Sequence, residues 1–213
     1  MLEDLLKACP ALFRLRISSI EESEIDEKFL QLLKNHPNVV DHLHIPLQSG
    51  SSSVLKRMRR KYDTAAFLAK LQAIRAVRPN IAITTDIIAG FPEETPEEWA
   101  ETMAFAQSAN FAEIHVFPFS SRPGTYAASL PDTDPKIKKE RVHELLGLSK
   151  TMRLAYEKRF YGQGLDVLYE SYDPEAHLAY GHTSNYLLVA TPSDHPRHGE
   201  IEKVVYGPKT AAD

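Results

Sequence analysis

The residues best placed to do chemistry lie between His42 and Tyr62, in the stretch HLHIPLQSGSSSVLKRMRRKY. Aliphatic residues alternate with His42 and His44 at its start, which predicts a strand with aliphatic side chains on one face and imidazoles on the other. Gln48 and Ser49 follow in a polar turn, whose Gly50 allows the backbone to come close to a ligand. We then expect a helix whose cationic face carries Lys56, Arg57, Arg59, Arg60 and Lys61.

A strand that leads through a polar loop into a helix is how parallel α/β folds build sites at the carboxyl ends of their strands. The hydrophobic pattern predicts four such strands, each separated from the next by a helical pattern. Their expected ranges are Phe13 to Ile17, His42 to Leu47, Ile81 to Ile88 and Glu113 to Phe119. The predicted fold is therefore α/β, with about four parallel strands and outer helices.

Capping signals predict where the helices of this layer begin. Ser23, followed three residues later by Asp26, resembles a capping arrangement. Thr95, with Pro96 and Glu98 after it, predicts a helix that begins at Pro96. Asp134 is expected to cap a long helix that runs to about Tyr161.

From Leu165 onward, short β-like runs follow one another with no helical pattern between them. We expect two parts: residues 1–162 as a partial (β/α) barrel, and residues 163–213 as a small all-β module. About fifty residues form a thin core, so the module is expected to be docked or incomplete.

The four predicted strands share an unusually polar second face. Its members are Arg14, Arg16, Ser18, His42, His44, Thr84, Asp86, Glu113 and His115. Buried charges need partners, so this face either holds a salt-bridge network or accommodates a ligand. Residues at the carboxyl ends of strands, such as Gln48 and Asp86, are the better candidates for a ligand site.

Composition bounds the function. The chain of 213 residues has one cysteine, which excludes an internal disulfide and a multi-cysteine metal site within it. No run approaches the roughly 20 apolar residues of a membrane span, so no membrane contact is expected, and the single cysteine fits a cytoplasmic setting. Because the net charge is −4, any nucleic-acid role must rest on a local basic patch.

The segment DIIAGFPEET, which starts at Asp86, resembles the fifth-strand adenosyl-binding motif of radical S-adenosylmethionine enzymes. Ile88, Gly90 and Glu93 match that motif, and Asp86 replaces its first glycine. Together with IPLQSGS, KRMRRKY and HVFPFSSRPGT, the chain resembles methylthiotransferases that act on N6-threonylcarbamoyladenosine in tRNA. The resemblance covers almost the whole chain, and it identifies the tail as similar to the small RNA-binding β-barrel (TRAM) module of that family.

The resemblance implies a site for S-adenosylmethionine and a contact surface for tRNA. Gln48 and Ser49 would bind the ribose or methionine moiety, and Arg59 or Arg60 its carboxylate. The remaining residues implied for this cofactor are Asp86, Ile88, Gly90, Glu93 and the backbone of Val116 and Phe117. Glu93 has a competing explanation, since a carboxylate near a helix start is stabilised by the helix dipole. Lys56, Arg57 and Lys61 would contact RNA phosphates, or else form a solvated helix face.

The chain also departs from the family, whose enzymes hold two 4Fe-4S clusters on two sets of three cysteines. Cys9 stands alone and is interpreted as structural. We therefore expect this chain to be the later part of the barrel plus the tail, inactive without the cluster-bearing N-terminal region, and to associate through its open sheet edges. Two alternatives remain: a non-catalytic RNA-binding protein, and a methylthiotransferase that acts on a ribosomal protein.

Overall fold

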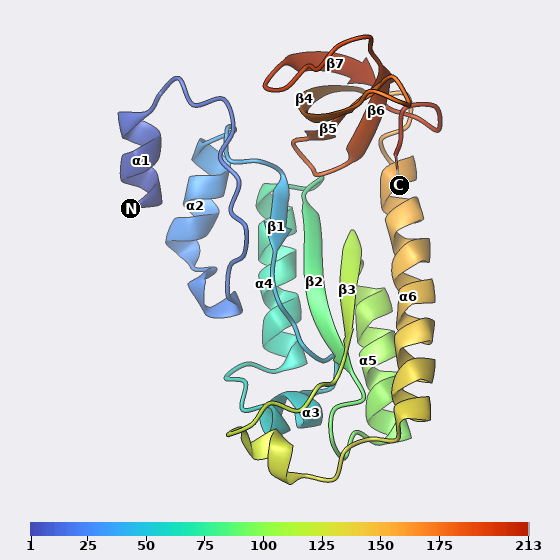
Figure 1. Cartoon of the computed structure of the whole chain (residues 1–213). Coiled ribbons are helices and arrows are strands. Elements are labelled where there is room, and N and C mark those ends of the chain that lie inside the picture. The colour runs from blue at the N-terminus through green and yellow to red at the C-terminus, as the bar shows by residue number, and fades with distance from the viewer. Residues whose placement is uncertain (213) are drawn as a thin grey trace.

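The computed structural model describes residues 1–212, which fold around two sheets (Figure 1). The first sheet is parallel, in the order β1-β2-β3, and the second is antiparallel, in the order β6-β5-β4-β7. The strands are β1 (His42–His44), β2 (Ala82–Ala89), β3 (Glu113–Pro118), β4 (Gly164–Asp173), β5 (Leu178–Thr183), β6 (Leu188–Pro192) and β7 (Ile201–Val205). The second sheet lies beyond the amino ends of the parallel strands, and the loops that follow their carboxyl ends lie at the opposite end of the molecule.

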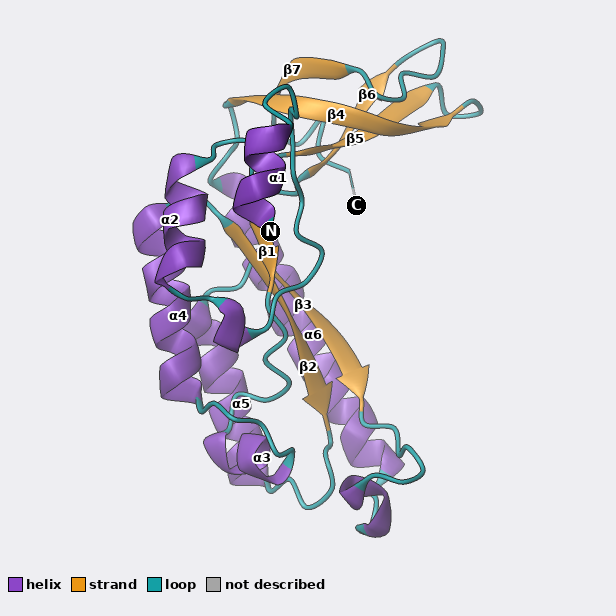
Figure 2. Cartoon of the chain, turned by 90° about the vertical axis from the view of Figure 1, so that its left-hand side faces the viewer, coloured by secondary structure: helices purple, strands orange, loops and turns teal. Residues whose placement is uncertain are grey.

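Helices connect and cover the parallel strands. The α-helices are α1 (Leu2–Ala8), α2 (Glu27–Asn35), α3 (Ser52–Arg57), α4 (Thr64–Val77), α5 (Pro96–Ala109) and α6 (Pro135–Lys158), and the 3-10 helices are η1 (Glu22–Glu24) and η2 (Tyr126–Ser129). Figure 2 shows α2, α4 and α5 together on one side of the parallel sheet. In the described residues, no helix is long and apolar enough to cross a membrane.

The main core lies between the parallel sheet and these helices. Leu43 and Ile45 of the first strand segment are almost fully buried in one cluster with Phe67 and Leu71 of α4. The aliphatic half of the predicted alternation therefore faces the helices, as expected from a strand period of two. This burial is what fixes the other half of the alternation on the opposite face.

Two of the predicted helix starts are confirmed, and one is wrong. The Thr95 side chain accepts a hydrogen bond from the Glu98 N–H, and the Glu98 side chain completes the capping box. Asp134 caps α6 through the Lys136 N–H. Ser23, in contrast, lies inside η1, and α2 is capped by Asp26 itself, whose carboxylate accepts from the Phe29 N–H.

The first predicted strand, Phe13 to Ile17, does not form. Only Leu15 pairs with the parallel layer, through an isolated bridge to Val39. Arg14 is held elsewhere, because its guanidinium donates to the backbone carbonyls of Asp166 at 2.5 Å and His182 at 2.9 Å in the second sheet. The parallel sheet consequently has three strands, not about four.

The expected cationic helix is also interrupted. Helix α3 ends at Arg57, and Arg59 takes a left-handed conformation with φ of 59°. The Arg60 N–H then turns back to the Leu55 carbonyl at 2.9 Å. The five cations therefore lie on a short helix and an irregular turn, and do not share one helical face.

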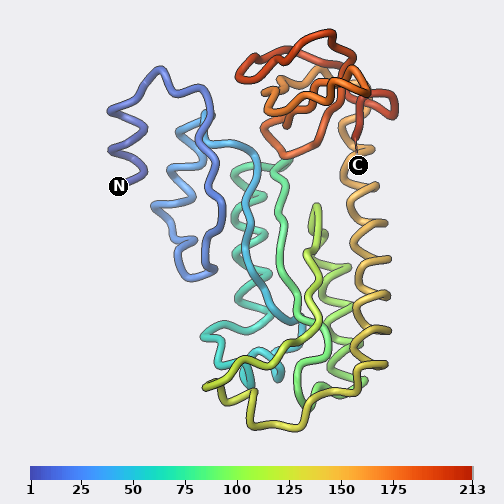
Figure 3. Tube along the Cα trace, in the orientation of Figure 1, coloured from blue at the N-terminus to red at the C-terminus, as the bar shows by residue number. Residues whose placement is uncertain are grey.

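The second sheet shares its core with the end of α6. Tyr156 of α6 and Phe160, just after the end of that helix, pack in one cluster with Val167, Tyr169 and Val189 of the sheet. The trace in Figure 3 returns to the end of α6, where the Gly162 N–H donates to the Tyr206 carbonyl at 2.8 Å. The division into residues 1–162 and 163–213 stays a prediction, because this core contains residues from both sides of it.

Candidate functional site

The polar face of the parallel strands carries a connected set of side chains. The His44 ring lies 3.0 Å through Nδ1 from the Thr84 hydroxyl and 3.3 Å through Nε2 from the Asp86 carboxylate. The His115 ring centroid is 5.5 Å from that of His44. This face lies opposite the buried Leu43 and Ile45, so the predicted partition of the strands is confirmed for β1 and its neighbours.

Two adjoining hollows open at the carboxyl ends of the parallel strands. Their volumes are about 410 Å³ and about 560 Å³, within the range of ligand pockets in proteins. They share Gln48, Arg60, Ile88, Thr125 and Ala127 in their walls. Gln48, Arg60, Asp86, Ile88 and Phe117 are thus brought to one place from three strands and the turn after α3, and Arg59 lines the smaller hollow.

The backbone around these hollows is strained. Gln48, Arg59 and Glu93 adopt left-handed φ values of 75°, 59° and 63°, which residues with a Cβ rarely take. Gln48 also continues β1, since its N–H donates to the Asp86 carbonyl at 2.8 Å and its own carbonyl accepts from Ile88. Its side-chain amide has no hydrogen-bond partner in the described part of the chain. Strain of this kind clusters at ligand sites, where the surrounding fold maintains it.

Several residues implied by the resemblance lie outside the hollows. Ser49 is fully buried, and its hydroxyl is 3.3 Å from that of Thr102 on α5, so its side chain points into the protein. Val116 packs against the helical core and offers only its backbone. Glu93 is exposed, and its carbonyl accepts from Arg57.

Arg57, which is predicted to contact RNA, has partners within the fold. The guanidinium makes two hydrogen bonds to the Glu98 carboxylate, at 2.7 and 2.6 Å, and a third to the Glu93 carbonyl. The hydrogen bonds to Glu98 raise the pKa of Arg57. Its charge is therefore neutralised within the fold, whereas Lys56 and Lys61 are exposed.

A buried ion pair next to the motif was not predicted. The Arg141 guanidinium of α6 lies 2.6 Å from the Glu94 carboxylate, and both side chains are almost fully buried. The same carboxylate accepts the Gly90 N–H at 3.0 Å, and burial raises the pKa of Glu94. This pair fixes the loop between β2 and α5. Gly90 of that loop also packs closely on α6, because a Cβ at its position would lie 2.3 Å from the Lys138 Cγ. Sequence reasoning missed it because Glu94 and Arg141 are 47 residues apart.

A further group of side chains gathers at the amino ends of the parallel strands. The Tyr186 ring stacks on His42 and on His182, each at 4.5 Å between centroids, and the Arg16 guanidinium is 4.5 Å from the same ring. Burial and the neighbouring Arg16 lower the pKa of His42 to about 3, so this imidazole is neutral. These contacts join the polar face to the second sheet.

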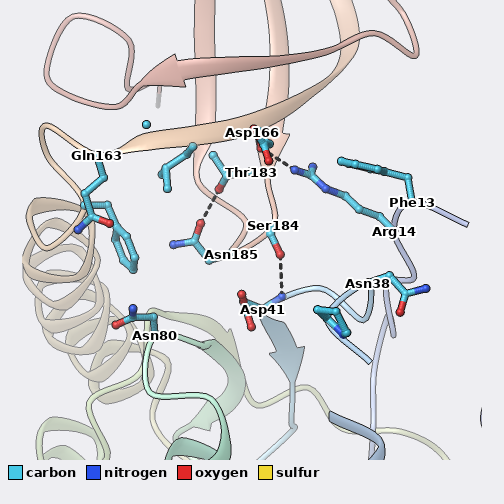
Figure 4. Close-up of a pocket in the computed structure, with 14 residues that line it drawn as sticks. Phe13, Arg14, Asn38, Asp41, Asn80, Gln163, Asp166, Thr183, Ser184 and Asn185 are labelled. Carbon is cyan, nitrogen blue, oxygen red and sulfur yellow. Dashed lines mark hydrogen bonds between the residues drawn. The ribbon is translucent and has the colours of Figure 1, made fainter. Parts of the chain in front are cut away.

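A hollow of about 520 Å³ lies beside this junction (Figure 4). Its polar groups bind one another: the Ser184 hydroxyl accepts the Asp41 N–H, and the Thr183 hydroxyl donates to the Asn185 amide oxygen. Arg14 donates across it to the Asp166 carbonyl. We interpret this hollow as part of the joint between the sheets.

The residues present do not fit an iron-sulfur cluster. The single cysteine, Cys9, is exposed and lies at the end of α1. Within residues 1–212 there is no group of three or more His, Cys, Asp or Glu side chains arranged to hold a metal ion. S-adenosylmethionine is a different case, because the hollows at the carboxyl ends offer the free Gln48 amide, the partly exposed Arg60 guanidinium and apolar walls.

The fold and this site define a class of protein. Residues 2–106 match the family model of the radical SAM superfamily. The structure also resembles that of coproporphyrinogen III oxidase from Escherichia coli, which is described as a radical SAM enzyme, with a TM-score of 0.57 over 91% of this chain and 51% of that one. At 17% identity that likeness supports the fold alone. The chain belongs to the radical SAM superfamily.

Its relatives within that superfamily are tRNA methylthiotransferases. The chain is 42% identical over 195 residues to threonylcarbamoyladenosine tRNA methylthiotransferase MtaB of Bacillus subtilis, covering 90% of this chain and 43% of the relative. Identity to the protein of the same name from Thermotoga maritima is 39%, over 80% of this chain and 40% of the relative. Identity to tRNA-2-methylthio-N(6)-dimethylallyladenosine synthase of Mycobacteroides abscessus is 40%, over 78% of this chain and 33% of the relative. The chain spans less than half the length of these relatives.

Proposed function

We propose that this chain is part of a tRNA-modifying methylthiotransferase that adds a methylthio group to C2 of N6-threonylcarbamoyladenosine next to the anticodon. The observation that carries the proposal is the pair of ligand-sized hollows at the carboxyl ends of three parallel strands, with the left-handed backbone of Gln48 and Arg59 in their walls. The identity to enzymes of that name over 90% of the chain supports the substrate. Because the relatives named above are tRNA enzymes, they favour this reading over the ribosomal-protein alternative.

In this proposal the hollow binds S-adenosylmethionine, which supplies the adenosyl group when bound. The Arg60 guanidinium would pair with the methionine carboxylate, and the free Gln48 amide would hydrogen-bond the ribose or the methionine amine. Ile88 and Phe117 would give adenine an apolar bed. Arg60 is available for this role, since its ion pair with Glu21 is long, at 3.8 Å, and Glu21 is exposed.

Cofactor binding can be measured on the chain as it is. Isothermal titration with S-adenosylmethionine should show binding, and Arg60→Gln should weaken it roughly tenfold through loss of a charge-assisted hydrogen bond. Lys150→Gln, an exposed cation on α6, is the matched control and should bind like the parent. Equal affinities of parent and Arg60→Gln would remove Arg60 from the site.

We further propose that the chain alone is inactive and that its reaction needs cluster cysteines supplied by polypeptide outside it. Incubation with iron, sulfide, dithionite and S-adenosylmethionine should yield no 5′-deoxyadenosine. Appreciable product would contradict this. Two open strand edges, on β1 and β3, would suit pairing with that polypeptide or with a second copy, and a cytoplasmic location fits a tRNA substrate.

A non-catalytic RNA-binding protein is the second candidate, favoured by the lack of cluster ligands in the described residues. Binding of tRNA with a steep salt dependence, but without any affinity for S-adenosylmethionine, would support it over the first.

A further inference from the structure

A row of polar side chains runs along β1 and β2, from the second sheet toward the hollows. Thr84 is at its centre, because its hydroxyl lies 3.2 Å from His42 Nε2 and 3.0 Å from His44 Nδ1. The other ring nitrogen of His44, Nε2, lies 3.3 Å from the Asp86 carboxylate, and Asp86 lines the larger hollow. We call these four residues the histidine row. It covers roughly 13 Å of strand, since His42 pairs with Ala82, four residues before Asp86.

The contacts of the histidine row fix where its protons lie. A carboxylate can only accept hydrogen bonds, so a neutral His44 carries its proton on Nε2, toward Asp86. Its Nδ1 then accepts from the Thr84 hydroxyl. That hydroxyl has a single proton, so it accepts in turn from the Nε2–H of His42. All three protons therefore point along the row toward Asp86.

His42, at the start of the row, has the matching protonation. Burial lowers its pKa to about 3, so the ring is neutral and supplies one N–H. Its Nδ1 is buried and has no hydrogen-bond partner in residues 1–212. A proton on Nδ1 would leave a buried donor without an acceptor and would take the N–H away from Thr84. The His42 ring therefore belongs in the Nε2–H tautomer.

The second sheet holds the His42 ring in place. Tyr186 stacks on it at 4.5 Å between centroids. Tyr186 has a left-handed φ of 65° in the hairpin between β5 and β6, which the Thr183 N–H closes by donating to the Leu187 carbonyl at 3.0 Å. His182 stacks on the same tyrosine, also at 4.5 Å. The position of the first ring in the row thus depends on this hairpin.

At the other end, only one oxygen of the Asp86 carboxylate is used. Oδ2 faces His44, and Oδ1 has no hydrogen-bond partner in the part of the chain that the structure describes. The Asp86 side chain is 25% exposed, so Oδ1 can accept from hydroxyl or ammonium groups of a ligand. A carboxylate that is already oriented loses less conformational freedom when it binds.

We propose that His44 is a positioning residue for the larger hollow: the histidine row holds its ring as the Nε2–H tautomer, and this ring orients the Asp86 carboxylate toward a bound ligand. The Tyr186 hairpin sets the start of the row. The second sheet, at the far end of the molecule, therefore contributes to cofactor affinity without touching the cofactor (Figure 1). The inference rests on the proposed function in taking S-adenosylmethionine as the ligand.

Nitrogen-15 NMR of the imidazole rings tests the row in the chain without ligand. At about pH 8.5, well above the ordinary histidine pKa of ~6.5, the couplings of the ring protons distinguish the two neutral tautomers. His42 and His44, assigned with His42→Gln and His44→Gln, should both be Nε2–H tautomers. Thr84→Val should leave His44 as a mixture, because its Nδ1 loses its donor, and Thr84→Ser should keep the parent tautomer. A parent chain with the His44 proton on Nδ1 would overturn the inference.

Isothermal titration with S-adenosylmethionine tests what the row does. Thr84→Val, which keeps the shape of the side chain, should weaken binding roughly fivefold through loss of the shared hydroxyl, whereas Thr84→Ser should bind within about twofold of the parent. Thr191→Val is the matched control, because it removes a hydroxyl that donates to Tyr169 at 2.7 Å within the second sheet. Its affinity should equal that of the parent. A role of Thr84 in folding alone would change thermal stability and leave both the tautomer and the affinity unchanged.

A second pair of variants tests the contribution of the hairpin. Tyr186→Leu should weaken S-adenosylmethionine binding roughly threefold, because the stacked His42 ring is no longer held. Tyr180→Leu removes another tyrosine of the same sheet, on β5, and should bind like the parent. Equal losses in the two variants would show that the hairpin has no specific part in the row.

The outcomes separate this inference from the function on which it rests. If the parent binds S-adenosylmethionine but Thr84→Val and Thr84→Ser bind it equally well, the positioning role is wrong and the proposed cofactor site stands. If the parent shows both Nε2–H tautomers and binds no S-adenosylmethionine, the cofactor site is overturned, and the positioning role for that cofactor falls with it.

Discussion

At the scale of single residues, the ion pair of Arg57 and Glu98 shows a cation that is used for structure. The Glu98 carboxylate also accepts from the Ser53 hydroxyl and the Thr95 N–H, in addition to the two bonds from Arg57. Together these donors lower the pKa of Glu98 to about 2, with the Arg57 hydrogen bond as the largest cause. The carboxylate therefore ties α3 to the start of α5.

This pKa sets a direction for the pH dependence of stability. A carboxyl group whose pKa is lower in the folded state stabilises the fold above its unfolded pKa, near 4.5, and loses that contribution as the pH falls toward 2. Glu98→Gln should cost about 1.5 to 3 kcal/mol at pH 7 and should flatten the loss of stability between pH 5 and 3. Urea unfolding at a series of pH values measures both effects.

The control for that series is Glu140→Gln, an exposed carboxyl group on α6. Its urea midpoints should follow those of the parent at every pH. A Glu98→Gln variant that tracks the parent from pH 7 to 3 would show that the ion pair contributes nothing measurable, as many surface pairs do.

Which site residues could be predicted depends on the range of the signal. Gln48 and Asp86 line one hollow, as strand alternation followed by a loop predicts for side chains at carboxyl ends, and Ile88, which the family resemblance implied, lines it too. The inward direction of the Ser49 side chain was not predicted. Gln48, the residue before it, has a φ of 75°, and this turn reverses the direction of the next side chain. Glu94 and Arg141 pair across 47 residues, and no local pattern carries that information.

At the scale of elements, the loop between β2 and α5 is held by close packing on α6. Gly90 has a φ of 74°, and any Cβ there would lie 2.3 Å from the Lys138 Cγ. Gly124 has a similar φ of 83°, but no atom lies within 4 Å of its Cβ position. At both positions the left-handed backbone disfavours a residue with a Cβ, and only at Gly90 would that Cβ also clash with a neighbour.

This difference predicts two distinct costs. Gly124→Ala should lower the free energy of unfolding by about 1 kcal/mol, the cost of a left-handed residue with a Cβ. Gly90→Ala should lower it by a further ~1 to 3 kcal/mol, because Lys138 must move. Chemical denaturation measures both, and Lys138→Ala in the Gly90→Ala background should restore most of the second cost. Equal effects at the two glycines would show that packing on α6 is loose.

Element prediction succeeded where local rules decide the outcome and failed where distant contacts override them. The Thr95 box and the Asp134 cap depend on residues within one turn, and both are present. Residues Phe13 to Ile17 have the alternation of apolar and polar residues that is typical of a strand. Arg14 nevertheless binds the second sheet, and one bridge, at Leu15, is all that forms in this segment. Sequence patterning contains no term for that contact.

At the scale of the whole molecule, the two sheets are joined by a chain of buried hydrogen bonds. The Thr183 hydroxyl donates to the Asn185 amide oxygen at 2.6 Å, and the Asn185 amide donates to the Tyr156 hydroxyl at 3.1 Å. Tyr156 donates in turn to the Asn80 carbonyl at 2.8 Å, just before β2. Burial raises the pKa of Tyr156, which keeps this hydroxyl protonated. Through these contacts the second sheet shares its stability with the first.

The shared contacts predict that both sheets unfold together. Asn185→Ala should cost about 1 to 3 kcal/mol, because it removes one hydrogen bond from each of two buried hydroxyl groups, those of Thr183 and Tyr156. Trp99, the single tryptophan, reports on α5 beside the parallel sheet, and hydrogen exchange at β5 amides reports on the second sheet. Asn185→Ala should lower the free energy of unfolding by the same amount at both probes, because a two-state transition gives coincident results from different probes.

The exposed Asn35→Ala, at the end of α2, is the control and should change neither probe by more than ~0.5 kcal/mol. If Asn185→Ala lowers protection at β5 while the Trp99 transition stays at the parent midpoint, the second sheet opens by itself, and a boundary near Gly162 then separates two independent folding units. If both move together, the joint at the amino ends of the strands holds the antiparallel sheet in a fixed position, at the end of the molecule opposite the hollows that Gln48 and Arg60 line.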